Sequence, residues 1–187
     1  MSSAVQRIPA APLRGFRAYG RFWVVLLGIL VADQFSKAWV AGQLPANTYF
    51  EPGPIAIIPK FFYIVNVTNT GAAWGMFSSF TPWLKWLGVV ALAAIFFFRR
   101  QLELSKPLLQ YSFGLLCGGI IGNLIDRAWH GRVVDFLDFH LPGYRWPAFN
   151  VADSGITVGV VIYLLYSFFT LRPEQPAASS TLSAAKE

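Results

Sequence analysis

The chain has 187 residues, of which 55% are hydrophobic and only 13% are charged, with a formal net charge of +6. Soluble domains carry about 25% charged residues, so this composition argues against a soluble fold and predicts one integral membrane domain. The basic excess does not indicate nucleic-acid binding, because lysines and arginines flank apolar runs, as expected of residues that orient membrane helices. The single cysteine, Cys117, excludes an internal disulfide and lies in an apolar run, which indicates a small core residue.

The first 21 residues contain four arginines and no acidic residue, which is typical of a cytoplasmic tail. The apolar run 22–41 has the length of a membrane span, and no small-residue cleavage site follows it, so we predict a permanent helix. Its second half carries Asp33 and Lys37, whose i, i+4 spacing places them on one helical face. This pair is either an anchor at the lipid headgroups or a support for a buried site.

Residues 42–80 differ in composition, with four prolines and the β-branched and aromatic run 61–67. These features predict a small extracytoplasmic β-rich insert that lies on the membrane. The insert ends in NVTNTGAAWGMF, where Asn69, Gly71 and two alanines suit a backbone that another group approaches closely, although a plain turn explains them equally. The triplet Asn66-Val-Thr68 matches a glycosylation acceptor, a match that is common by chance.

Three further apolar segments, 80–98, 108–125 and 149–171, predict the remaining membrane helices. The residues between the first two of these segments include three basic side chains, which places that loop in the cytoplasm. Glycines four residues apart predict grooves in which another helix packs closely. They are Gly114, Gly118, Gly122, Gly155 and Gly159.

The predicted fold class is therefore an all-α membrane protein with four transmembrane helices and the β-rich insert between the first and second. Residues 22–171 form a single membrane domain, 1–21 a basic cytoplasmic tail, and 172–187 a disordered cytoplasmic tail. Both termini lie inside, so the loop 126–148 lies outside.

Four of the nine acidic residues lie on the outer side of the third and fourth helices, namely Asp126, Asp135, Asp138 and Asp153. An ionisable side chain costs a few kcal/mol at membrane depth, so it usually has a function there. The element N-x-x-D occurs twice, as Asn123 with Asp126 and as Asn150 with Asp153, so each amide can hydrogen-bond its own acid. Both elements also have structural explanations that require no function. The second fits a helix N-cap, and Asp126 beside Arg127 fits an interfacial ion pair.

Two carboxylates that share one proton can activate a water and protonate a carbonyl oxygen, so an aspartic peptidase explains this concentration of acids. Signatures of zinc peptidases (HExxH), serine hydrolases (GxSxG) and P-loop proteins are absent from the sequence. His130 and His140 could join the acids in a metal site, but their spacing matches no recognised one. Ser36 and Lys37 are adjacent and diverge on a helix, which disfavours a Ser/Lys nucleophile.

A non-enzymatic alternative is a proton-coupled carrier, or a scaffold whose acids pair with Arg127 and Arg132 to hold the helices together. Neither inverted repeats nor broken helices, which are typical of transporters, are evident in the sequence. The separation of the Asp135 and Asp153 side chains distinguishes the two classes, because a dyad requires both acids at one water.

Five motifs in chain order resemble those of lipoprotein signal peptidase, also called signal peptidase II: DQFSK (33–37), NTGAAW (69–74), GNLIDR (122–127), VVDF (133–136) and FNVAD (149–153). The resemblance implies a four-helix aspartic peptidase of the bacterial inner membrane with an extracytoplasmic β-cradle. Such an enzyme cleaves the signal peptide of a prolipoprotein just before its diacylglyceryl-modified cysteine. The implied partners are lipidated prolipoproteins and membrane lipid, with no nucleic acid, and the implied state is a monomer without cofactor or metal.

The resemblance also implies roles for individual residues. The catalytic acids are Asp135 and Asp153; the residues that bind substrate or support the dyad are Asn69, Asn123, Arg127 and Asn150; the structural polar residues are Asp33, Lys37 and Asp126. The sequence itself favours Asp135 over Asp126 weakly, because Asp135 lies between Val134 and Phe136, where poor solvation raises the pKa of a carboxyl. A lipid-modified substrate stays in the bilayer, so a site at the membrane edge can reach its scissile bond.

Overall fold

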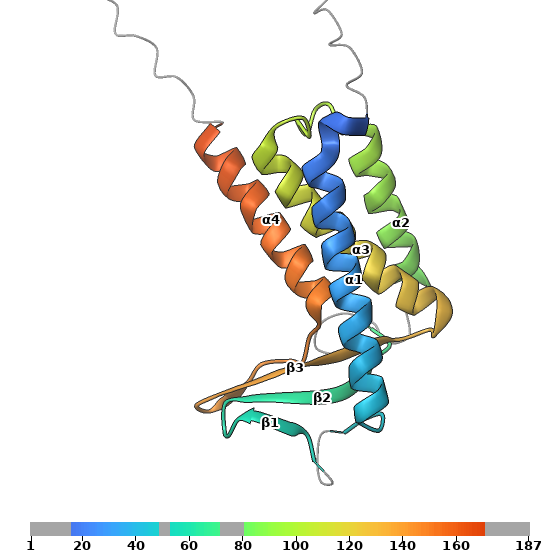
Figure 1. The fold of residues 1–187 in the computed structure, drawn as a ribbon, viewed down its shortest axis with the longest axis vertical. Coiled ribbons are helices and arrows are strands. Elements are labelled where there is room, and N and C mark those ends of the chain that lie inside the picture. The colour runs from blue at the N-terminus through green and yellow to red at the C-terminus, as the bar shows by residue number, and fades with distance from the viewer. Residues whose placement is uncertain (1–15, 49–52, 72–80, 171–187) are drawn as a thin grey trace, which may run out of the picture.

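The computed structural model describes residues 16–48, 53–71 and 81–170, which form a group of helices with a sheet at one end (Figure 1). The helices are α1 (Gly20–Gln43), α2 (Thr81–Phe97), α3 (Pro107–Trp129) and α4 (Val151–Thr170), and a short 3-10 helix, η1 (Phe16–Tyr19), precedes α1. The strands are β1 (Ile55–Ile58), β2 (Phe62–Asn69), β3 (Val133–Leu141) and β4 (Tyr144–Arg145), which form one antiparallel sheet in this order.

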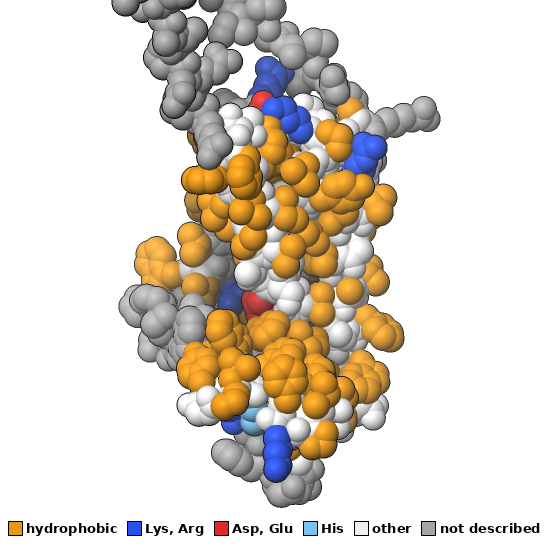
Figure 2. Space-filling view, turned by 90° about the vertical axis from the view of Figure 1, so that its left-hand side faces the viewer, with side chains coloured by type: hydrophobic (Ala, Val, Ile, Leu, Met, Phe, Trp, Pro, Cys, Tyr) orange, Lys and Arg blue, Asp and Glu red, His pale blue; other side chains and the backbone are white. Residues whose placement is uncertain are grey.

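All four predicted helical segments are helices. Three of them, α1, α3 and α4, are long and apolar enough to cross a membrane, whereas α2 has 17 residues and is shorter. Helix α3 begins with Pro107 at its first turn and continues past the predicted end at residue 125 to Trp129. The turn that follows contains Gly131 at a φ of +69°, a conformation that favours glycine. Figure 2 shows apolar side chains over much of the helical surface.

The sheet draws its strands from two distant parts of the chain. Strands β1 and β2 confirm a β-rich insert between the first two helices, but β3 and β4 come from 126–148, so the prediction of a loop there is wrong. The run VVDFLDFHL is rich in β-branched and aromatic residues, which favour strands, and the prediction considered only its acids. Strand β3 pairs with β2 so that Asp135 lies opposite Val67 and Asn69 opposite Val133. The sheet therefore holds Asp135 on an inner strand.

Helix α3 lies at the centre of the helices and contacts α1, α2 and α4. A methyl group on Gly118 would lie 2.7 Å from the carbonyl oxygen of Leu26 in α1. A methyl group on Gly119 would overlap the carbonyl oxygen of Ala152 in α4. The approach at Gly118 confirms a predicted glycine groove, whereas Gly119 was not among the predicted glycines. Only a residue without a side chain lets the backbones come so close.

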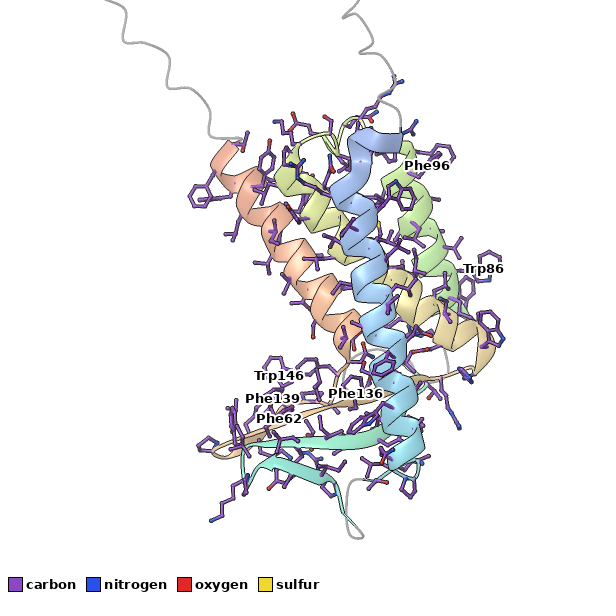
Figure 3. All side chains as sticks on the ribbon, in the orientation of Figure 1. Phe62, Trp86, Phe96, Phe136, Phe139 and Trp146 are labelled. Atoms are coloured by element: carbon purple, nitrogen blue, oxygen red, sulfur yellow. The ribbon has the colours of Figure 1, made fainter. Side chains whose placement is uncertain are left out.

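An aromatic layer separates the sheet from the helices (Figure 3). The Phe139 ring stacks on Phe62, with ring centroids 4.5 Å apart, and on Phe149 at 5.8 Å. Phe136 packs with Val40 of α1 in a second apolar cluster. Rings stacked in this way bury a large apolar area, and together with the contact between Phe136 and α1 they hold the sheet against the neighbouring ends of the helices.

We predict that Gly119→Ala destabilises the protein by about 1–3 kcal/mol, because the added methyl group forces α3 and α4 apart. The matched control is Gly28→Ala in α1, where an added methyl group has no neighbour within 4 Å. Alanine is favoured over glycine in a helix, so the control should unfold at the same or a higher temperature than the wild type. Thermal unfolding in detergent measures both, and equal midpoints for the two variants would contradict this packing.

Candidate active site

Asp135 of β3 and Asp153 of the first turn of α4 line the same pocket, whose volume is about 970 Å³. Asn69, Asn123 and Arg127 also line it, and most of the remaining wall is apolar and comes from α2, α3, α4 and the sheet. Figure 2 shows acidic and basic side chains recessed between the apolar surface of the helices and that of the sheet. The fold thus brings together two acids that are far apart in the sequence.

The backbone before α4 is bonded to β3, and this places the two acids side by side. The Leu137 N–H donates to the carbonyl of Phe149 at 2.8 Å, and the Phe149 N–H donates back to Leu137 at 3.1 Å. The next residue, Asn150, precedes α4, so the strand that carries Asp135 also positions the start of the helix that carries Asp153.

Asp135 is buried and accepts two hydrogen bonds from neutral amides. Asn69 Nδ2 donates to its Oδ2 at 2.9 Å, and Asn150 Nδ2 donates to its Oδ1 at 2.7 Å. Burial first, and then the negative charge of Asp153, raise the pKa of Asp135 to about 7, although the two amides act in the opposite direction. The predicted poor solvation of Asp135 is confirmed by its burial, and a carboxyl with this pKa is partly protonated at neutral pH.

Asp153 forms a reciprocal cap with Asn150. The Asp153 N–H donates to Asn150 Oδ1 at 2.9 Å, and the Asn150 N–H donates to Asp153 Oδ2 at 3.2 Å. The N-cap alternative is therefore confirmed, and the same contacts orient the acid toward the pocket. Asn123 Nδ2 of α3 donates to the other oxygen, Oδ1, at 2.8 Å. Asn123 thus contacts Asp153 of another helix rather than Asp126, and the expectation of two equivalent N-x-x-D pairs is wrong for the first.

The acids and lysine of α1 and α3 form a separate ionic cluster behind the pocket. Lys37 Nζ lies 2.8 Å from Asp33 Oδ2 and 2.6 Å from Asp126 Oδ2. Asp33 is fully buried and Lys37 is 4% exposed, so an anchor at the headgroups is wrong, and the alternative of a buried support holds. Asp126 pairs with α1 rather than with Arg127. Asp33 Oδ1 also accepts the N–H of Ala152 at 2.9 Å, so α1 holds the first turn of α4.

Gln34 belongs to the same cluster and was not identified from the sequence. Its Nε2 donates to Asp126 Oδ1 and to Asp33 Oδ2, both at 3.1 Å. The sequence signal for Gln34 is its position between Asp33 and Lys37 in an apolar helix, because a polar amide is unusual there.

Arg127 donates to two backbone carbonyls, those of Asn123 at 3.3 Å and Gly71 at 3.2 Å. Arg132 is exposed. Among the ion pairs of the residues that the structure describes, none joins either arginine to an acid, so the pairing expected for a scaffold is not found. Gly71 itself donates to Asn69 Oδ1 at 2.8 Å, which links the end of the insert to the site.

Other candidates from the sequence lie elsewhere. Asp138 is buried beside Arg145, whose Nε donates to it at 3.0 Å, and beside His140, whose Nε2 lies 2.9 Å from it. Asn66 is buried and donates to the carbonyl of Leu44 at 2.7 Å, so the glycosylation alternative is wrong. Residues 72–74 of the motif NTGAAW lie outside the described residues.

This arrangement is suited to general acid–base catalysis. One carboxyl is partly protonated near neutral pH, and the second, which lines the same pocket, accepts hydrogen bonds from two donors of the chain, Asn123 Nδ2 and the Asn150 N–H. The largely apolar walls lower the local dielectric constant, which strengthens electrostatic interactions at the acids.

Comparison with known proteins points the same way. Residues 25–169 match the family model described as signal peptidase (SPase) II. The chain is 45% identical over 153 residues to the lipoprotein signal peptidase of Oleidesulfovibrio alaskensis, covering 78% of this chain and 94% of that protein. It is 38% identical over 166 residues to that of Desulforapulum autotrophicum, covering 84% and 98%.

A solved bacterial membrane enzyme, determined by the in meso method at 2.3 Å resolution, superposes with a TM-score of 0.71 at 31% identity, covering 84% of this chain and 94% of that one. A 1.9 Å structure of the same description gives a TM-score of 0.70 at 31% identity, covering 82% and 95%. The extent of the family match and the identity to these relatives together show that the chain belongs to the signal peptidase II family.

Proposed function

We propose that this chain is an aspartic endopeptidase that removes the signal peptide from prolipoproteins, by hydrolysing the bond before the diacylglyceryl-modified cysteine. The family match and the relatives named lipoprotein signal peptidase support this substrate class. One observation carries the assignment of the dyad: Asn150 bonds both acids at once. Its side chain donates to Asp135, and its backbone donates to Asp153.

In the proposed reaction, protonated Asp135 donates a hydrogen bond to the carbonyl oxygen of the scissile bond. Ionised Asp153 accepts a proton from a water, whose oxygen attacks the carbonyl carbon. The resulting tetrahedral intermediate collapses as the C–N bond breaks, and the leaving amine takes a proton from the dyad. Donors from Asn123 and Asn150 and the N-terminal end of α4 stabilise the negative charge of Asp153.

The pocket offers the substrate an apolar groove and a few polar groups. Leu87 of α2, Ile120 and Leu124 of α3 and Ile156 of α4 line it. A diacylglyceryl cysteine can therefore stay among apolar groups while its peptide bond reaches the acids. Arg127 and Asn69 are the proposed contacts to the substrate backbone.

The proposed topology has four spans, with both termini in the cytoplasm and the sheet outside. The start of α1 and the end of α4 lie at one end of the helices, and the sheet lies at the other (Figure 1). At 1.5 Å per residue α2 is about 26 Å long, close to the hydrocarbon thickness of a bilayer. Its exposed Trp83 and Trp86 fit a lipid contact. We place this single membrane domain, as a monomer, in the bacterial inner membrane.

Asp135→Asn and Asp153→Asn should each lower the cleavage of a lipidated precursor by about 10²–10⁴-fold or more, because each removes one partner of the proton transfer. Both variants should remain folded, since asparagine has nearly the same shape. The measurement is turnover of purified protein in detergent or vesicles, with thermal unfolding as the check on folding. Near-normal turnover by either folded variant would refute the dyad.

Asp126→Asn is the matched control for the dyad variants, because Asp126 is also a buried aspartate but belongs to the ionic cluster. It should lower the unfolding temperature, since Lys37 loses one of its two carboxylate partners, while cleavage persists. A stable, folded and inactive Asp126→Asn variant would instead indicate a dyad that includes Asp126.

The raised pKa of Asp135 predicts a pH-dependent stability. In the unfolded chain the carboxyl loses its proton near the ordinary pKa of 3.8, but in the folded protein it does so at about 7. The folded state therefore binds more protons between these values, and this group destabilises it progressively as pH rises from 3.8 to about 7. The unfolding temperature of Asp135→Asn should consequently fall less over this range than that of the wild type. Parallel curves would show that Asp135 ionises normally.

A further inference from the structure

The amides that hold the two acids share one arrangement. In each asparagine, the side-chain oxygen accepts a hydrogen bond from a group that can only donate. The side-chain nitrogen therefore points to a carboxylate. Asn69 Oδ1 accepts from the Gly71 N–H, and Asn150 Oδ1 accepts from the Asp153 N–H. For Asn123 the donor is a side chain, because Lys37 Nζ lies 3.0 Å from its Oδ1.

A lysine ammonium has three donor hydrogens and no acceptor, so it can face only the oxygen of the Asn123 amide. The nitrogen must then point to Asp153, where it donates at 2.8 Å. The other contact to the Asn123 oxygen, from Asn150 Nδ2, is long at 3.4 Å. Without Lys37 the amide can rotate and present its oxygen to the carboxylate, which would replace an attraction by a repulsion.

The ammonium has three partners: it donates hydrogen bonds to Asp33 and Asn123 and forms an ion pair with Asp126. Two carboxylates would suffice to keep the lysine charged and to join α1 to α3. The third contact adds nothing to that ionic link, but it reaches an amide that touches the acid of the pocket. Lys37 itself does not line the pocket.

We infer that Lys37 is a positioning residue for the hydrolysis: it fixes the amide of Asn123 and through that amide holds Asp153 in the orientation that accepts the proton of water. This inference rests on the proposed function. It assigns the lysine a part in turnover, beyond its part in holding the helices together.

The test is a double-substitution cycle in an Asp126→Asn background, because that background removes one of the two carboxylates that Lys37 neutralises. Lys37→Met then leaves the summed charge of the cluster equal to that of the wild type, and Asp33 keeps its hydrogen bonds from Gln34 and the Ala152 N–H. The four proteins are the background alone, with Lys37→Met, with Asn123→Ala, and with both. For each, kcat and KM are measured on a lipidated precursor, and thermal unfolding confirms the fold.

In the presence of Asn123, Lys37→Met should lower kcat by about ten- to hundredfold, the usual effect of losing a hydrogen bond to a charged group, and leave KM within about twofold. In the Asn123→Ala background the same substitution should change kcat by less than about twofold. A purely structural lysine would lower kcat equally in both backgrounds, or raise KM, and either result overturns the inference. So does an unchanged kcat in the presence of Asn123.

A second variant keeps the question open to refutation if Lys37→Met does not fold. Asn123→Asp in the Asp126→Asn background preserves the total charge of the wild type and the acceptor for Lys37, but replaces the donor to Asp153 by a carboxylate oxygen. It should fold and lose at least about tenfold in kcat, whereas turnover equal to that of the background would overturn the inference.

If the wild type and the background also fail to cleave, the proposed function fails. If they cleave and the dyad variants do not, only the role of Lys37 is in question.

Discussion

A carboxylate removed from water must receive hydrogen bonds or a counter-charge from the chain, and this requirement organises the interior of the protein. Its buried acids meet it in two ways. Asp33 and Asp126 share the lysine of α1, and Asp138 is held by an arginine, so these acids are paired with cations. The acids of the pocket, Asp135 and Asp153, receive their hydrogen bonds from neutral amides and backbone N–H groups. A neutral donor leaves the charge uncompensated, and these two acids are the ones that share a proton in the proposed mechanism.

The sheet and the helices each position part of the site. Strand β2 supplies Asn69 and its neighbour β3 supplies Asp135, so one acid and one of its donors are fixed by strand register. The backbone bonded to β3 leads directly into the cap of α4, which fixes the second acid. Glycine at the α3–α4 contact brings the helix bearing Asn123 close enough to complete the set. The polar contacts are thus consequences of apolar packing and strand pairing.

Much of this could be predicted from the sequence, because its signals are local. Apolar length identified the helices, and glycine spacing identified the close contacts of α3. The N-cap at Asn150 could be predicted from its spacing of three residues from Asp153 in the sequence. Strand β3 was missed because its partner lies in the insert, more than 60 residues earlier, and the run was considered for its acids alone. The hydrogen-bond partner of Asn123 was predicted to be Asp126 instead of Asp153, because spacing along one helix cannot show which residue of another helix lies nearby. Separating Asp135 from Asp126 required a family resemblance, because their different donors appear only in three dimensions.

The bond between Asp33 and the N–H of Ala152 joins positions 119 residues apart, on the first and last helices. During synthesis α1 is made long before α4. The carboxylate of Asp33 therefore lacks this partner until the chain is nearly complete. The pocket can hold both Asp135 and Asp153 only after this last helix has been made, because Asp153 lies in its first turn. If Asp135 and Asp153 act together as proposed, a chain of this kind stays inactive until its last helix is in place.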